Sequence, residues 1–183
     1  MVEELFEEEL LIPKERVAVL IGPKGKTKKQ IEKIGNVKLQ IDAKEGLVRM
    51  QAKDALTLWL GRQVVEAIGR GFNPEIAQKI FKEENSFELI NLQDYGGKSK
   101  KSLERLRGRL IGTKGKTKRV IRHYTGADIS VHGKTVGIIG PAEGVQVAHR
   151  AIEMLLSGAR HGTVYHFLET QTKQKFRGAQ RNS

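Results

Sequence analysis

The sequence contains no cysteine among its 183 residues, so disulfide bonds and thiolate metal sites are both excluded. It also lacks any apolar run close to the roughly 20 residues that a membrane-spanning helix needs. Residues 1–9 hold five glutamates and no basic residue, unlike the basic start and apolar middle of a signal peptide. We therefore expect a cytoplasmic protein that has no membrane contact, no metal ion and no other cofactor.

Acidic residues are scarce relative to basic ones: 21 stand against 33, for a net charge of +12. Setting aside the five glutamates of residues 1–9 raises the net charge of the rest of the chain to +17. Such a basic body indicates a polyanionic partner, which can be nucleic acid or an anionic membrane.

One segment of twelve residues occurs twice, at an offset of 90 positions. Residues 20–31 read LIGPKGKTKKQI and residues 110–121 read LIGTKGKTKRVI, and nine of the twelve positions are identical. The differing pairs are Pro23/Thr113, Lys29/Arg119 and Gln30/Val120. A repeat of this length implies two copies of one domain.

The flanks of each repeat predict the same order of elements, β-α-α-β-β-α. In the first copy, apolar spacing predicts two core-facing helical stripes. The shorter helix carries Thr27, Ile31 and Ile34. The longer one is expected to turn inward Leu56, Trp59, Leu60, Val64, Ala67 and Ile68. Gly46 marks a hairpin between the two strands that separate these helices.

The predicted fold class is α+β, with two tandem domains that each have a three-stranded sheet backed by helices. The first domain is expected at residues 5–71, a linker helix capped by Asn73-Pro74 at residues 72–86, and the second domain at residues 87–160. Residues 161–183 are expected to form a C-terminal helix and a basic tail that is disordered at its end. The basic residues of this tail are Lys173, Lys175, Arg177 and Arg181.

The second copy differs from the first by an extra segment, Asp94–Lys101, which contains two glycines and three lysines. A flexible loop is the ordinary prediction for such a segment. A basic loop that contacts RNA is the alternative.

The succession helix, Gly-x-x-Gly, helix resembles the RNA-clamping turn of a KH domain. Glycine permits positive φ and close approach of a phosphate, and the free N–H groups that open the second helix attract anions. In the first copy the expected RNA-binding residues are Leu20, Ile21, Gly22, Pro23, Lys24, Gly25, Lys26 and Lys28. In the second copy they are Leu110, Ile111, Gly112, Thr113, Lys114, Gly115, Lys116, Lys118, Arg119, Arg122 and Ile129.

Bases held beside such a turn need an aliphatic surface. Besides the residues before each turn, the candidates for it are Ile31, Leu39, Ile121 and Ile129. Several of these must also build the core. For Leu20 and Leu110, base contact and core packing remain open alternatives.

Two other nucleotide-binding classes fit less well. Gly-Lys-Thr at residues 25–27 and 115–117 resembles the end of a phosphate-binding NTPase loop, but that loop needs glycine where Leu20 and Leu110 stand and must follow a strand. An RRM needs exposed aromatic residues, and aromatics are 5% of this chain. The five histidines show no spacing with carboxylates that suggests a metal site, so we do not expect an enzyme.

Two segments of the second copy narrow the resemblance. Residues 107–117 and 131–141 are similar to the KH proteins of small-ribosomal-subunit biogenesis, the partner-of-Nob and KRR-type pre-rRNA processing factors, whose archaeal members are two KH domains and little else. The resemblance implies type I KH folds, binding to the single-stranded 3′ region of small-subunit rRNA, and partnership with the rRNA-processing endonuclease or other assembly factors. We expect a monomer.

The first copy departs from that family's eukaryotic pattern, in which the first turn tends to lose its glycines. Here Gly22 and Gly25 are kept, while the acidic start of the chain would repel phosphate. The first domain can therefore bind RNA or dock a protein. Two other functions stay open for the whole chain: a KH subunit of an RNA-degrading complex such as an exosome cap, and a purely structural adaptor.

Overall fold

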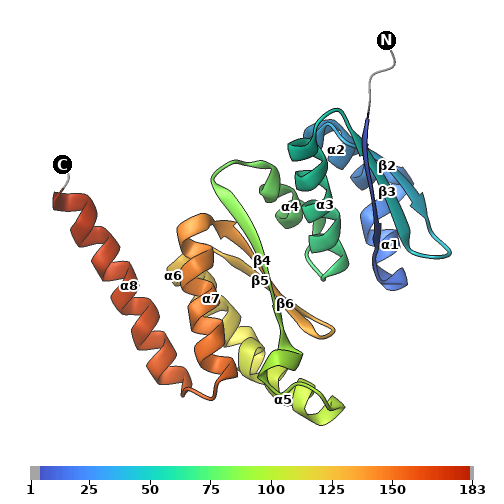
Figure 1. Ribbon diagram of the computed structural model, residues 1–183. Helices are drawn as coiled ribbons and strands as arrows, with labels where there is room; N and C mark the ends of the chain where they lie inside the picture. The colour runs from blue at the N-terminus through green and yellow to red at the C-terminus, as the bar shows by residue number, and fades with distance from the viewer. Residues whose placement is uncertain (1–4, 182–183) are drawn as a thin grey trace. The chain divides into compact units, whose positions relative to one another are not determined.

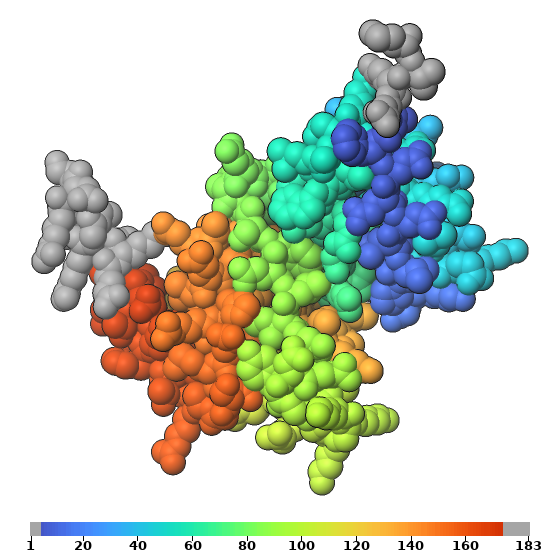
Figure 2. All heavy atoms as spheres, in the orientation of Figure 1, coloured from blue at the N-terminus to red at the C-terminus, as the bar shows by residue number. Residues whose placement is uncertain are grey.

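The computed structural model describes residues 5–181, with side chains for residues 5–173. The chain divides into two units, Met1–Asn85 and Ser86–Ser183, and each builds its own sheet and core (Figure 1). Figure 2 shows that side chains fill the spaces between the ribbons within each unit. The predicted fold class, two three-stranded sheets each backed by helices, is confirmed.

The first unit has an antiparallel sheet in the order β1-β3-β2. Its elements are β1 (Phe6–Leu11), α1 (Lys14–Ile21), α2 (Lys26–Gly35), β2 (Lys38–Asp42), β3 (Leu47–Ala52) and α3 (Ala55–Gly69). Alternation along β3 buries Val48 and Met50 and turns Arg49 to the open face. There Arg49 Nε lies 2.6 Å from Glu9 Oε1, so part of the acidic start is already paired.

The predicted inward faces of two helices need correction. Ile34, Leu56 and Trp59 are 54%, 65% and 50% exposed, so none of them belongs to the core. The buried side of α3 instead runs through Leu58, Gly61, Val64, Val65 and Ile68. This side of α3 faces the core because Gly61 lets the helix approach Val37 closely. A Cβ at Gly61 would lie 3.1 Å from the methyl groups of Val37. Counting large apolar residues missed this.

The predicted linker helix forms a short α4 (Pro74–Ala77) followed by the 3-10 turn η2 (Gln78–Phe81). Both pack on α3, and Ala77 and Ile80 are buried in the first unit. Phe81 covers Gly35 so closely that a Cβ there would lie 2.3 Å from the ring. Asn73 stands at the N-cap and Pro74 begins the helix, as predicted, but the Asn73 side chain accepts no capping hydrogen bond from the described backbone.

The second unit repeats the arrangement with sheet order β4-β6-β5. Its elements are β4 (Asn85–Asn91), the 3-10 turn η3 (Leu92–Tyr95), α5 (Lys100–Ile111), α6 (Lys116–Thr125), β5 (Asp128–His132), β6 (Thr135–Pro141), α7 (Ala142–Leu156) and α8 (His161–Arg181). The helix α8 follows α7 as the short α4 and η2 follow α3 in the first unit, but it is much longer. Val164 and Leu168 of α8 are buried in the core of the second unit, where α8 packs against α6 and α7. Figure 1 shows α8 in red beside these two helices.

The segment Asp94–Lys101 consists of the end of η3, a turn and the start of α5, which corrects the prediction of a loop. Ser99 and Ser102 form a reciprocal capping box that opens α5. The hydroxyl of Tyr95 donates to Glu153 Oε1 at 3.1 Å, and burial together with that hydrogen bond raises the pKa of the phenol. The segment is therefore tied to α7.

The expected disorder at the end of the tail falls outside the described residues. None of the helices in the described part of the chain combines the length and the apolarity needed to span a bilayer.

Candidate nucleic-acid interface

The two Gly-x-x-Gly turns adopt the same backbone conformation. Gly22 and Gly112 have φ of 70° and 72°, and Gly25 and Gly115 have φ of 73° and 74°. At Gly22 a Cβ would also lie 2.1 Å from Thr27 Oγ1, so space as well as conformation demands glycine. Around Gly25 no described heavy atom lies within 4 Å of a Cβ position, which leaves room for a ligand's backbone.

Between the two glycines of each turn stands an exposed lysine with positive φ, 52° at both Lys24 and Lys114. Holding a lysine in the left-handed region costs roughly 1 kcal/mol, so surrounding contacts must impose it. In the second unit, Arg119 Nη1 donates to the carbonyl of Lys114 at 2.5 Å and ties the turn to α6. The side chain of Lys114 is left at the surface of the turn that opens α6.

The aliphatic residues that precede the turns divide between core and surface. Leu20 and Leu110 are 0% and 1% exposed, which corrects the expectation that they could contact bases. They face inward because Val17 and Leu20, and likewise Leu106 and Leu110, lie three or four residues apart on the core side of their helices. Ile31, Leu39, Ile121 and Ile129 are buried as well. Ile21, half-buried, and Ile111, 36% exposed, are left beside the turns.

The charges around the two turns differ although the backbones match. Glu15 of α1 corresponds to Arg105 of α5, and Glu32 of α2 corresponds to Arg122 of α6. Glu32 Oε1 holds the ammonium of Lys28 at 3.1 Å, which neutralises one of the lysines near the first turn.

Arg122 pairs with Asp128 at 3.1 Å yet remains 64% exposed. The second turn is therefore the more favourable site for a polyanion.

Two further arginines of α5 were absent from the sequence prediction. Arg107 Nε donates to the carbonyl of Gly133, in the β5–β6 turn, at 2.9 Å. Arg109 Nε donates to the carbonyl of Leu155 at 3.0 Å. Their acceptors are neutral carbonyls, so these hydrogen bonds do not offset the charge of either arginine. Comparing the two repeats position by position, at the offset of 90, would have pointed to this excess of arginine in the second copy.

The two turns also differ in one residue between their glycines, which is Pro23 in the first turn and Thr113 in the second. Pro23 has no N–H group to offer a phosphate, whereas Thr113 has both an N–H group and a hydroxyl. The second turn therefore presents more hydrogen-bond donors than the first, in addition to more positive charge.

The C-terminal helix also reaches the second turn, which sequence reasoning did not anticipate. Tyr165 Oη lies 3.1 Å from Thr117 Oγ1, and His161 Nε2 lies 2.9 Å from the carbonyl oxygen of Arg109. No sequence pattern within residues 161–173 signals these contacts, because they depend on how α8 folds back on α5 and α6.

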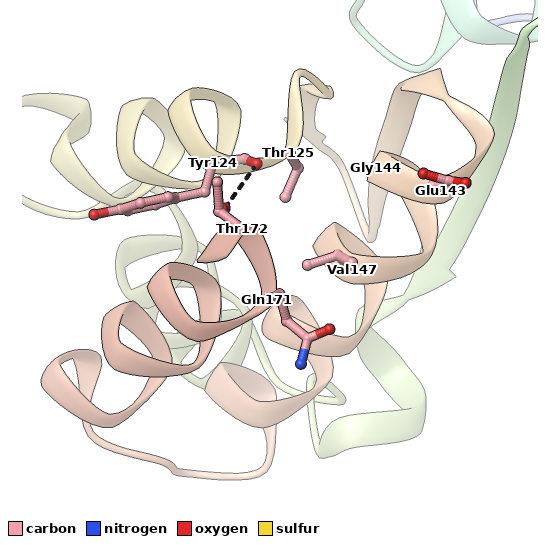
Figure 3. A pocket seen from close by; sticks show the side chains of 7 residues that line it. All are labelled: Tyr124, Thr125, Glu143, Gly144, Val147, Gln171 and Thr172. Atoms are coloured by element: carbon pink, nitrogen blue, oxygen red, sulfur yellow. Dashed lines mark hydrogen bonds between the residues drawn. The ribbon is translucent and has the colours of Figure 1, made fainter. Parts of the chain in front are cut away.

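A separate hollow of about 250 Å³ lies between α6, α7 and α8 (Figure 3). Thr125, Val147 and Thr172 surround it, and the Thr172 hydroxyl donates to the carbonyl of Tyr124 at 3.4 Å. The charged residue on its wall is Glu143, which would repel a phosphate. Within the described part of the chain, no group of three or more histidine or acidic residues could hold a metal ion.

Comparisons with known proteins agree with this geometry. The family model described as a eukaryotic type KH-domain (KH-domain type I) matches residues 86–173, and the KH domain model matches residues 7–58. A KH domain-containing protein of Methanocaldococcus jannaschii is 51% identical over 174 residues, which cover 93% of this chain and 75% of that protein.

Two crystal structures from Pyrococcus horikoshii are similar over most of the chain. Dim2p has a TM-score of 0.84 and 46% identity, covering 90% of this chain and 99% of its own. Dim2p in the a/eIF2alpha-aDim2p-rRNA complex has a TM-score of 0.86 and 45% identity, covering 93% and 96%. A protein of unknown function from Aeropyrum pernix has a TM-score of 0.90 and 30% identity, covering 98% and 97%.

Proposed function

The chain belongs to the family of two-KH-domain ribosome biogenesis factors that includes Dim2p of Pyrococcus horikoshii, and on that premise we propose that its second KH domain clamps single-stranded RNA at the 3′ region of small-subunit rRNA. A KH turn clamps about four backbone nucleotides. The relative Dim2p was crystallised in a complex with rRNA, which supports the choice of ligand.

The observation that carries the proposal is the second turn. Its open glycine backbone, exposed Lys114 and flanking Arg105 and Arg122 meet the needs of a sugar-phosphate chain. Phosphate contacts position the strand, and contacts to base edges beside Ile111 supply sequence preference.

The rest of the proposal concerns role and setting. We propose a cytoplasmic monomer that acts by binding and hands the rRNA to a processing endonuclease or other assembly factors. The alternative of an exosome cap is less well supported, because such caps usually carry an S1-type barrel. The strands of the described residues are all used in the two three-stranded sheets.

Competition binding with three RNAs tests this function. The competitors are a short single strand from the 3′ end of small-subunit rRNA, the same strand annealed to its complement, and a scrambled strand of equal length. The first should compete about tenfold better than the duplex, because an A-form duplex hides base edges from a KH groove. Near-physiological salt weakens nonspecific attraction by the basic body.

The pattern of competition separates the possible failures. If duplex and single strand compete equally, the KH groove does not hold the RNA and the protein is a general basic binder. If the scrambled strand equals the rRNA strand while the duplex fails, single-strand binding stands and the ribosomal assignment is lost.

The salt dependence of binding should report how many turns are engaged. For single strands, log affinity falls with log salt by roughly 0.7 per neutralised phosphate. One engaged domain with about three phosphate contacts gives a slope near 2, and two domains with about six give a slope near 4. We expect the lower value for an RNA of about six nucleotides, measured by titration at several salt concentrations. A slope near zero would mean that phosphate contacts do not hold the RNA.

A further inference from the structure

A hollow of about 490 Å³ opens on the side of the second turn that faces α8. Gly112 and Thr113 of the turn form one wall, and His161 and Tyr165 of α8 form another. The hollow is continuous with the second turn, because Gly112 and Thr113 belong to the turn and also line the hollow. A strand that crosses the turn therefore meets this hollow next.

The chemistry of the hollow suits a nucleotide. Tyr165 presents a half-buried ring whose hydroxyl is fixed by Thr117, and Lys116 Nζ lies 6.0 Å from the ring centroid. Arg105 lines the same hollow and is exposed. An aromatic ring with cations beside it is the usual combination for stacking a base and neutralising its phosphate. The aromatic residue comes from α8, so the KH repeat alone would not supply it.

The wall of the hollow formed by α5 leaves space for a ligand at Gly108. Gly108, in the last turn of α5, is exposed, and a Cβ there would meet no described heavy atom within 4 Å. The space above this position is therefore open to a ligand.

The first domain lacks these features, although its turn has the same backbone. Ala18 stands where α5 has Gly108, and Glu15 stands where it has Arg105. At the place where α8 carries Tyr165, the first unit carries Glu75 on the short α4, so the described residues there offer no aromatic ring. The hollow thus distinguishes the second domain from the first.

We propose that this hollow binds one nucleotide next to those clamped by the second turn, with its base against Tyr165 and its phosphate between Arg105 and Lys116. The proposal rests on the proposed function, since it extends the same RNA path. It assigns α8 a direct part in RNA binding, beyond completing the core.

The proposal is tested by measuring how affinity depends on RNA length, in the unaltered protein and in a variant whose hollow is filled by a larger side chain. Gly108→Leu places a side chain in the open space, and leucine favours a helix more than glycine does, so the full-length variant should fold. Ala18→Leu is the matched control, because it adds bulk at the equivalent exposed position of the first domain. Each protein is titrated with a four-nucleotide RNA and with the same RNA extended by two nucleotides at its 5′ or its 3′ end.

For the unaltered protein, one of the two extensions should raise affinity about tenfold, the size expected for one stacked base. Gly108→Leu should abolish this gain and leave four-nucleotide binding within about twofold of the unaltered protein, whereas Ala18→Leu should keep the gain. Arg105→Glu, which installs the residue of the first copy, should also remove the gain. It should lower the salt slope for the extended RNA by about 0.7, one phosphate contact. A purely structural role of Arg105 would leave that slope unchanged.

Two results would overturn the proposal: no gain from either extension in the unaltered protein, or a full gain retained by Gly108→Leu. Both leave four-nucleotide binding intact, so they are distinct from failure of the proposed function. If the proposed function failed, the unaltered protein would instead show no preference for single-stranded over duplex RNA, or would bind none of these RNAs.

Discussion

Replacing Thr113 and Lys114 together with aspartate should lower the affinity for single-stranded RNA by a factor of roughly 30 to 100. The pair of changes alters the charge at the turn by three units. A unit charge 4 Å from a phosphate is worth about 1 kcal/mol in water, and salt reduces this further. A total of about 2 to 3 kcal/mol corresponds to that loss, at about 1.4 kcal/mol per factor of ten.

The fold should survive this change. Both side chains are exposed, and Lys114 contributes only its carbonyl to the hydrogen bond from Arg119. Aspartate also tolerates the left-handed conformation better than most residues. Circular dichroism melting checks the fold, and fluorescence anisotropy with a labelled RNA measures the affinity.

The matched control is Pro23→Asp with Lys24→Asp in the first turn. This pair should cost only a few-fold in affinity. Glu15 and Glu32 already make the first turn less attractive to phosphate, and Pro23 has no N–H group to lose. Equal losses of affinity from the two pairs of substitutions would refute the claim that the second domain contributes more to RNA binding than the first.

The order of elements could be predicted from the sequence because local signals agreed with one another. The repeat indicated two copies of one domain, and the apolar spacing of each copy indicated which segments are helices. Gly46 then marked the hairpin to β3, with which β2 pairs in an antiparallel register. These signals act over a few residues, so tertiary packing had little to overrule.

Burial of single side chains was predicted less well, because it depends on what lies across the core. Trp59 has the spacing of a core residue, yet Gly61 and Val37 decide which side of α3 is closest to α2 and β2. Tyr165 shows the same limit for the site. Its place beside Thr117 follows from the packing of Val164 and Leu168, 47 or more residues away from that threonine.

Truncating Leu110 to alanine should destabilise the second unit by about 3 kcal/mol and leave the RNA affinity of the folded protein nearly unchanged. The side chain is 1% exposed and packs in the core with Leu106 and Ile121, so its removal leaves a cavity. Urea unfolding of the full chain, followed by a signal from the second unit, measures the loss. The RNA titration is done without urea, at a temperature well below the unfolding midpoint of the variant, so that the variant is folded.

Ile111→Ala is the matched variant one residue along the chain. Ile111 is 36% exposed beside the turn, so its truncation should cost less than about 1 kcal/mol of stability. It should instead weaken RNA binding, by about fivefold, because it removes aliphatic surface available to a base. Neighbouring residues of one helix thus have opposite expected effects, since one points into the core and the other away from it. If Leu110→Ala lost RNA affinity and kept its stability, the leucine would form the floor of the groove, and the assignment of that surface to Ile111 would be wrong.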